Sequence, residues 1–197
     1  MLSLYTGTPG SGKTLHAVSR ARWHVRRRKP VISNVALALD ADYFTYRDNK
    51  SLTPQYLRDF SESYFHGEPP REDEILLIVD EAQLLFNSRN WDDANRMKFL
   101  EFLSQHRHLG YEIILIAQSD AMSDKQFRAL VEYEVKHHKL CRFSWLGKLL
   151  SFFGLIPLHI ANTFLYSAKN MRIGSDMYLC TKSLRGLYDT YAMLETV

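Results

Sequence analysis

Short apolar runs alternate with helical stretches along the first two thirds of the chain. The runs are continuous, as is typical of parallel strands covered on both faces, and they comprise Leu2–Thr6, Val31–Val35, Glu74–Asp80 and Glu112–Gln118. The predicted helices lie between them, at residues 15–28, 53–64 and 92–108. Residues 40–54 are polar and aromatic with a proline and are predicted to form a loop. Strands that alternate with helices predict βαβ units, and therefore an α/β fold of three layers around a mainly parallel sheet.

Beyond residue 130 the pattern becomes the alternation of apolar and polar residues that is typical of antiparallel strands with one polar face. Val131–Lys136 alternates in this way, and Ile160–Lys169 and Asp176–Thr181 look similar. We therefore expect a single domain over residues 1–197, with its core in residues 1–130 and a β-rich extension or hairpin in residues 131–197.

One segment of the extension, residues 143–158, is strongly apolar but is interrupted by Gly147, Lys148, Gly154 and Pro157. It is too short and too broken for a transmembrane helix. Two interpretations stay open: a hairpin tip folded onto the core, or a surface that lies on a membrane or against a neighbouring subunit.

Composition and charge add little to this picture. Of the 197 residues 46% are hydrophobic and 24% are charged, which is typical of a globular domain, and a net charge of +3 is too small to indicate nucleic-acid binding. Basic residues gather where the first predicted helix ends, at Arg20, Arg22, Arg26, Arg27, Arg28 and Lys29. A solvated helix end is the first interpretation, and an anionic partner, either lipid headgroups or nucleic acid, is the second. Two cysteines favour a reducing compartment.

The most specific motif lies between the first predicted strand and the first predicted helix, where residues 7–14 match the Walker A pattern G-x-x-x-x-G-K-T. Glycines let the backbone turn its N–H groups toward phosphates. Lys13 supplies a point charge for the β- and γ-phosphates, and the Thr14 hydroxyl can bind Mg²⁺. The residues expected to bind ATP are Gly7, Thr8, Pro9, Gly10, Ser11, Gly12, Lys13 and Thr14.

Two carboxylates end the third predicted strand, as in a Walker B motif. Asp80 is suited to bind the metal opposite Thr14, and Glu81 is suited to polarise an attacking water molecule. The chain has no signature of an acceptor site for a kinase substrate, so this pair favours hydrolysis over phosphate transfer to a small molecule.

Gln118 ends the next predicted strand, where its amide can hold the γ-phosphate or the water molecule; a plain polar residue at a strand end is the alternative. A nucleotide hydrolase of this kind also uses an arginine finger to stabilise the transition state. The candidates are Arg89, Arg96, Arg107 and Arg128.

Three segments together resemble the zonula occludens toxin (Zot) family: residues 7–14, Val79–Gln83 and the stretch from His106 to Gln118. Asn34 and Arg89 also fit. The resemblance covers residues 1–130 well and the β-rich tail less specifically, and its most specific part is the stretch that ends at Gln118.

The resemblance implies an assembly and export ATPase of filamentous phage, similar to the gene I protein and embedded in the bacterial inner membrane. It implies a fold similar to the additional-strand P-loop ATPases of the FtsK/HerA kind, which often act as rings. It supports site roles for Lys13, Thr14, Asp80, Glu81 and Gln118, and arginine-finger roles for Arg107 and Arg89.

Full-length members of the family continue into a transmembrane span and an outer domain, and the toxin activity is associated with that outer part. We therefore expect this chain to be a domain, soluble by itself, at the cytoplasmic face of the inner membrane. The leading hypothesis is a homo-oligomeric, Mg²⁺- and ATP-dependent motor that extrudes a phage particle or DNA together with phage or envelope assembly proteins. The alternative is a nucleotide-dependent switch or scaffold at the membrane.

Overall fold

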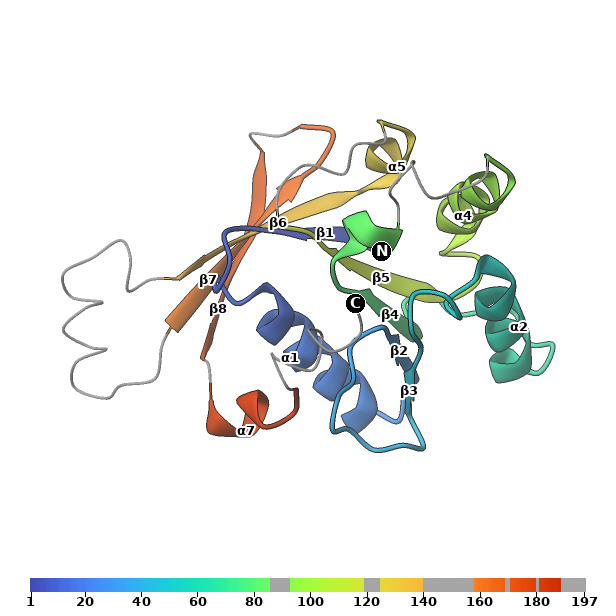
Figure 1. Ribbon diagram of the computed structural model, residues 1–197, viewed down its shortest axis with the longest axis horizontal. Helices are drawn as coiled ribbons and strands as arrows, with labels where there is room; N and C mark the ends of the chain where they lie inside the picture. Colours follow the sequence, from blue (N-terminus) through green and yellow to red (C-terminus); the bar gives the residue numbers. More distant parts are fainter. Residues whose placement is uncertain (86–92, 119–124, 140–157, 169–170, 180, 189–197) are drawn as a thin grey trace.

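A single twisted sheet runs through the computed structural model, which describes residues 1–85, 93–118, 125–139, 158–168, 171–179 and 181–188 (Figure 1). In these residues the sheet has eight strands in the order β3-β2-β4-β5-β1-β6-β7-β8. The strands are β1 (Leu2–Thr6), β2 (Val31–Ser33), β3 (Phe44–Tyr46), β4 (Ile75–Val79), β5 (Tyr111–Ile116), β6 (Tyr133–Lys139), β7 (Leu158–Leu165) and β8 (Arg172–Leu179). Neighbours from β3 to β6 pair in parallel, and β7 and β8 pair antiparallel.

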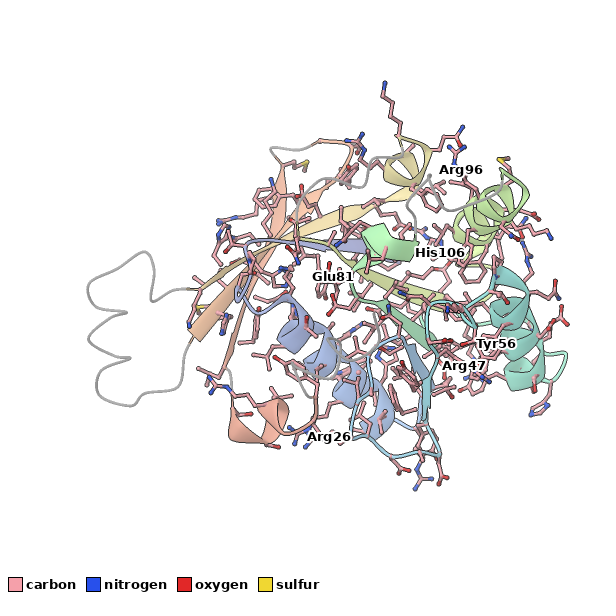
Figure 2. All side chains as sticks on the ribbon, viewed as in Figure 1. Arg26, Arg47, Tyr56, Glu81, Arg96 and His106 are labelled. Carbon is pink, nitrogen blue, oxygen red and sulfur yellow. The ribbon has the colours of Figure 1, made fainter. Side chains whose placement is uncertain are left out.

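The described helices cover both faces of this sheet, so the predicted three-layer α/β architecture is confirmed (Figure 1). They are α1 (Lys13–Arg26), α2 (Pro54–Phe65), α3 (Ala82–Leu85), α4 (Asp93–Gln105), α5 (Lys125–Leu130) and α7 (Lys182–Arg185). Helices α1 and α7 pack on one face, and α2, α4 and α5 pack on the other. Glu81 follows the carboxyl end of β4, and Arg26 ends α1 (Figure 2). None of the helices in the described ranges is both long enough and apolar enough to cross a membrane.

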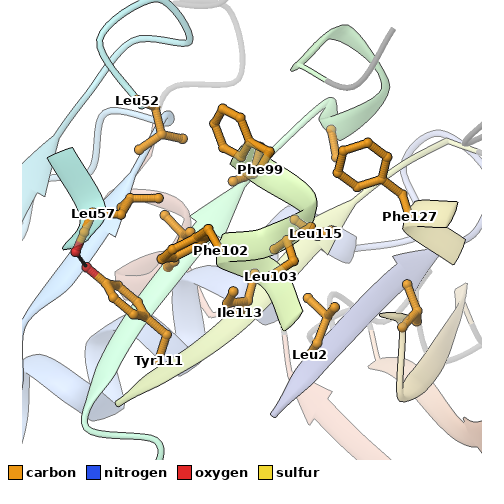
Figure 3. Packing of buried hydrophobic residues seen from close by; sticks show 14 of the residues in the cluster. Leu2, Leu52, Leu57, Phe99, Phe102, Leu103, Tyr111, Ile113, Leu115 and Phe127 are labelled. Carbon is orange, nitrogen blue, oxygen red and sulfur yellow. Dashed lines mark hydrogen bonds between the residues drawn. The ribbon is translucent and has the colours of Figure 1, made fainter. Parts of the chain in front are cut away.

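Large apolar side chains fill the core beneath α2, α4 and α5 (Figure 3). Phe102 of α4 is fully buried and meets Tyr111 of β5 edge to face, with ring centroids 5.3 Å apart. The Tyr111 hydroxyl donates a hydrogen bond to the Leu57 carbonyl of α2 at 2.7 Å, which satisfies the one polar atom of this buried ring. The contact joins α2 and α4 to the start of β5 and so fixes one layer on the sheet.

The central strands are arranged around an additional strand, since β5 lies between β1 and β4. The Walker A loop follows β1 and the Walker B carboxylates follow β4. Because these strands are parallel, their carboxyl ends lie at one edge of the sheet, which is where ligands bind in open α/β sheets. The sheet therefore brings together two motifs that lie more than 60 residues apart in the chain.

Two expectations for the strands were wrong in detail. β6 does not belong to a purely antiparallel unit, because it pairs in parallel with β1 and antiparallel with β7. Its alternating pattern reports one partly exposed face and carries no information on strand direction. Residues 40–54 are not all loop, because β3 lies within them; it is a three-residue edge strand with little burial and hence no apolar pattern. The apolar segment 143–158 lies outside the described residues except for Leu158, which begins β7.

Candidate functional site

The loop between β1 and α1 turns sharply, and glycine is required at both of its ends. Gly7 has φ of 139° and Gly12 has φ of 96°, a region that other residues rarely adopt. A Cβ atom at Gly7 would lie 2.6 Å from the His137 carbonyl oxygen, and one at Gly12 would lie 2.6 Å from His159 Nδ1. The loop is therefore closely backed by β6 and β7, and its backbone directs α1 toward the space above the sheet edge.

Lys13 and Thr14 form the first turn of α1. Lys13 Nζ reaches back over the loop and donates hydrogen bonds to the carbonyl oxygens of Gly7 at 2.9 Å and Thr8 at 3.4 Å. Partial burial lowers the pKa of Lys13, while the nearby charges of Asp80 and Glu81 oppose that shift. The ammonium group therefore contacts the loop and lies near the two carboxylates. A bound triphosphate would place further negative charge beside it.

The Walker A and Walker B motifs meet through one hydrogen bond, in which Thr14 Oγ1 donates to Asp80 Oδ2 at 2.7 Å. Asp80 is 7% exposed, and its burial raises its pKa, an effect partly opposed by the hydrogen bonds from Thr14 and from the Glu81 amide. The Thr14 hydroxyl and the buried Asp80 carboxylate lie next to each other, and both are oxygen ligands of the type that Mg²⁺ prefers. A divalent cation there would favour the ionised form of Asp80.

Asn34, which follows β2, fixes the backbone of Asp80. Its Oδ1 accepts from the Asp80 amide at 2.7 Å, and its Nδ2 donates to the Asp80 carbonyl at 2.8 Å. Nδ2 also donates to Asn49 Oδ1 at 2.8 Å. The paired amide bonds leave the Asp80 carboxylate free to turn toward Thr14.

Glu81 has a backbone φ of 49°, in the left-handed region that few residues other than glycine adopt. Its side chain is held by two amides: Gln118 Nε2 donates to Oε1 at 3.0 Å, and Gln83 Nε2 donates to Oε2. Its amide donates to Asp80 Oδ1 at 2.8 Å. Backbone strain of this kind persists where the surroundings over-determine it, often at functional sites. The arrangement holds a half-buried carboxylate beside the metal-type ligands Thr14 and Asp80.

The structure does not bring Arg107 to this site within one chain. Arg107 follows α4, just before β5 begins, whereas Gln118 comes after β5 ends, so the two lie toward opposite edges of the sheet. Arg107 Nε and Nη2 donate to the Glu132 carboxylate at 3.2 and 2.5 Å, a pairing that raises the pKa of Arg107. Arg96 on α4 bonds to Gln126, and Arg89 lies outside the described residues. The role of Arg107 or Arg89 as an arginine finger that acts on the site of a neighbouring subunit stays a prediction.

The basic end of α1 is partly explained by ion pairs within the fold. Arg20 forms two hydrogen bonds with the buried Glu112, at 2.9 and 2.8 Å, and Lys29 lies 2.7 Å from Glu74. The Arg27 guanidinium lies 3.7 Å from the centre of the Trp23 ring, a cation–π contact. Arg26, like Arg27 and Arg28, is exposed, as expected for a solvated helix end.

A group of aromatic and histidine side chains lies behind the loop and was not predicted from the sequence. His159 Nδ1 lies 2.8 Å from the Ser11 carbonyl oxygen, and the Tyr178 hydroxyl donates to the Gly12 carbonyl at 2.9 Å. These residues are 148 and 166 positions from their partners. Only the alternation of the last two strands points to them, since it places His159, Ala161 and Thr163 on one face of β7.

Burial of His137 predicts an acid-sensitive fold. Burial lowers its pKa to about 3, so the folded protein holds it neutral while the unfolded chain, with a pKa near 6.5, takes up a proton first as pH falls. The free energy of unfolding should therefore decrease below about pH 6.5, by about 2 kcal/mol from this residue between pH 7 and pH 5. Urea unfolding at both pH values, compared between the wild type and His137→Gln, measures this. An equal pH-dependent loss in both proteins would contradict the assignment.

Comparison with known proteins gives one family and a consistent set of relatives. The family model described as "Zonular occludens toxin (Zot)" matches residues 1–179. The Gene 1 protein of Salmonella phage IKe is 33% identical over 165 residues, covering 78% of this chain and 45% of that protein. The Gene 1 protein of Enterobacteria phage fd is 30% identical over 203 residues, covering 94% of this chain and 58% of that protein. The chain thus spans about half the length of these relatives.

Solved structures also share the fold, among them a Zot domain and a viral packaging NTPase. The N-terminal domain of zonular occludens toxin from Neisseria meningitidis has a TM-score of 0.58 and 23% identity, covering 95% of this chain and 97% of that one. The genome packaging NTPase B204 of Sulfolobus turreted icosahedral virus 2, solved in complex with ATP-gammaS, has a TM-score of 0.54 and 14% identity, covering 90% of this chain and 96% of that one. At these identities the likeness establishes the P-loop NTPase fold, which agrees with the fold predicted from the sequence.

Proposed function

We propose that this chain, which belongs to the zonular occludens toxin (Zot) family, binds and hydrolyses ATP as part of a machine that assembles and exports filamentous phage. The observation that carries the proposal is the hydrogen bond between Thr14 and Asp80, which joins a complete Walker A loop to a Walker B carboxylate. The assembly role follows from the family resemblance and is supported by a further relative, the "Putative assembly protein ORF301" of Pseudomonas phage Pf3, which is 29% identical over 133 residues. That role belongs to proteins about twice as long, so it is proposed for this chain as one part of a larger protein.

The loop residues would bind the triphosphate through backbone N–H groups at the start of α1, where the helix dipole also favours negative charge. Lys13 would exchange its bonds to the loop carbonyls for bonds to the β- and γ-phosphates. Thr14 and Asp80 would hold Mg²⁺, which neutralises charge on the phosphates when it is bound. Asn34 keeps Asp80 in place for this role.

Glu81 is the residue best suited to activate water. Its carboxylate accepts hydrogen bonds from Gln83 and Gln118, which orient it without supplying a proton that could neutralise it. A carboxylate held in this way can accept a proton from a water molecule aligned with the γ-phosphate. Gln118, at the exposed rim, is close enough to Glu81 to contact the same water molecule or the γ-phosphate.

A motor and a nucleotide-dependent switch differ in how fast they hydrolyse ATP: a motor turns ATP over continuously, whereas a switch or scaffold binds it and turns it over little. If the chain works as a ring at the cytoplasmic face of the inner membrane, hydrolysis per subunit should rise with protein concentration as subunits associate. The experiment measures phosphate release from Mg·ATP over a wide range of chain concentrations. Turnover that rises with concentration supports the motor, and tight binding with no turnover at any concentration would support a switch or scaffold in its place.

Mixing two inactive variants tests whether Arg107 acts on a neighbouring subunit. Glu81→Gln subunits keep Arg107 but lack the catalytic carboxylate, whereas Arg107→Ala subunits keep the complete Walker site. An arginine finger contributes about 10³–10⁵-fold to turnover in related chemistry, so each variant alone should be nearly inactive and the mixture should recover part of the activity. The same mixture with Arg89→Ala tests the second candidate. No recovery at any ratio, with both variants folded and associated, would exclude Arg107 from this role.

A further inference from the structure

Four aromatic rings form a continuous stack behind the phosphate loop. The ring centroids of Tyr5 and His16 lie 5.0 Å apart, those of His16 and Tyr178 lie 4.7 Å apart, and those of Tyr178 and His159 lie 5.4 Å apart. Neighbouring planes are within 16–21° of parallel. The rings come from β1, α1, β8 and β7, so the stack joins the two elements that carry the loop to the strands at the far end of the sheet.

His159 and Tyr178, at one end of the stack, also make hydrogen bonds to the loop itself. His159 Nδ1 must carry the hydrogen in its 2.8 Å bond to the Ser11 carbonyl, because a carbonyl oxygen only accepts. The Tyr178 hydroxyl donates to the Gly12 carbonyl at 2.9 Å. His159 and Tyr178 are direct cross-strand partners in β7 and β8, so one position of this antiparallel pair supplies both donors.

These bonds fix the direction in which the loop presents its amide groups. A trans peptide unit points its carbonyl oxygen and its N–H in opposite directions. The unit that contains the Ser11 carbonyl also contains the Gly12 N–H, and the unit that contains the Gly12 carbonyl also contains the Lys13 N–H. His159 holds the Ser11 carbonyl oxygen toward β7, so the Gly12 N–H points away from that strand. The Gly12 carbonyl oxygen accepts from Tyr178 and also from the His16 N–H of α1 at 2.9 Å, and the two bonds together fix the direction of the Lys13 N–H. Hydrogen bonding at a carbonyl also polarises the N–H of the same unit.

The side chains of His159 and Tyr178 approach the loop closely at Gly12. A Cβ atom at Gly12 would lie 2.6 Å from His159 Nδ1 and 2.8 Å from the Tyr178 hydroxyl oxygen. His159 of β7 is 4% exposed, and His137 of the neighbouring strand β6 is 1% exposed. His137 lies 3.0 Å from His16 and 3.2 Å from the Thr6 carbonyl, which fixes the first residue before the loop in the same way.

We propose that Tyr178 and His159 are positioning residues for phosphate binding: strands β7 and β8 hold the Ser11 and Gly12 carbonyl oxygens and thereby aim the Gly12 and Lys13 N–H groups at the β-phosphate of the nucleotide. This inference rests on the proposed nucleotide site. It assigns a task in nucleotide binding to the β-rich extension, and it makes the affinity of the loop depend on the position of β8, which lies at the opposite edge of the described sheet from β3.

The test compares variants that remove one donor and keep the ring. Tyr178→Phe and His159→Phe should each weaken binding of Mg·ATP and Mg·ADP by about 3- to 10-fold, the factor expected for one hydrogen bond. KM should rise by the same factor with kcat nearly unchanged, because the amide contacts form in the ground state and the transition state alike. His159→Asn, whose amide can donate from nearly the position of Nδ1, should restore affinity relative to His159→Phe. Tyr46→Phe, at an exposed tyrosine of β3, is the matched control and should leave affinity unchanged.

The outcomes separate this inference from the proposed function. A wild-type chain that binds no Mg·ATP or Mg·ADP overturns both. A wild-type chain that binds, together with folded Tyr178→Phe and His159→Phe variants of unchanged affinity, overturns the positioning role alone. A lower melting temperature with unchanged affinity in the folded variants means a purely structural stack and also overturns it. Weaker binding in both variants, with recovery in His159→Asn, supports it.

Discussion

Glu81→Gln should stop ATP hydrolysis while leaving ATP binding nearly intact. The glutamine has the same shape, and its carbonyl oxygen can still accept the hydrogen bond from Gln118 Nε2 that holds Glu81 now. It cannot accept a proton from water, so turnover should fall by about 10²-fold or more. Phosphate release at saturating Mg·ATP measures the loss, and equilibrium binding of Mg·ATP to the same variant measures what is retained.

Asp80→Asn is the matched comparison, because it changes the adjacent carboxylate in the same way. Asp80 accepts from Thr14 at 2.7 Å and is assigned to the metal, so its loss should weaken binding in the presence of Mg²⁺ far more than in its absence. The two variants should therefore fail at different steps. If both kept binding and lost turnover equally, or both lost binding equally, the division of roles between Asp80 and Glu81 would be wrong.

Lys13→Ala should abolish tight nucleotide binding without unfolding the protein. The ammonium group bonds only to the loop carbonyls of Gly7 and Thr8 among the described residues, so its removal costs the fold little. Nucleotide at about 100 times its Kd stabilises a folded protein by about 2.7 kcal/mol, which raises the melting temperature of a chain of this size by about 5–10 °C. Wild-type protein should show that rise with Mg·ATP, and Lys13→Ala should show almost none.

Lys50→Ala provides the control for this experiment, because Lys50 is an exposed lysine in the loop after β3. It should keep the full rise in melting temperature. A Lys13→Ala protein that is stabilised by Mg·ATP as strongly as the wild type would refute the Walker A assignment, since the point charge on the phosphates would then be dispensable.

The local motifs were predictable from the sequence because their chemistry is carried by neighbouring residues. The glycines, Lys13 and Thr14 are contiguous, and the continuous apolar runs before Gly7 and before Asp80 identify buried parallel strands. Parallel strands share one edge for their carboxyl ends, so the meeting of Thr14 with Asp80 follows from the fold class. Gln118, which follows the end of β5, reaches Glu81 for the same reason.

The rest depends on contacts that no local pattern encodes. Arg107 precedes β5 and Gln118 follows it, so the strand separates these two predicted site residues, and Glu132 binds Arg107 at the far end. Tyr178 and His159 contact the loop only because β6, β7 and β8 continue the sheet beside β1. An alternating pattern predicts which residues share a face of a strand, whereas the neighbour of each strand is decided by the packing of the whole chain.

The most direct test of the account is a calorimetric titration of the wild-type chain with ATP, in Mg²⁺ and again with the metal removed by a chelator. The Walker A loop, with Thr14 and Asp80 joined at 2.7 Å, predicts saturable binding of about one nucleotide per chain in Mg²⁺ and clearly weaker binding without it. Saturable binding of equal strength under both conditions would contradict the metal site. No saturable binding in Mg²⁺, with the protein folded, would contradict the account as a whole.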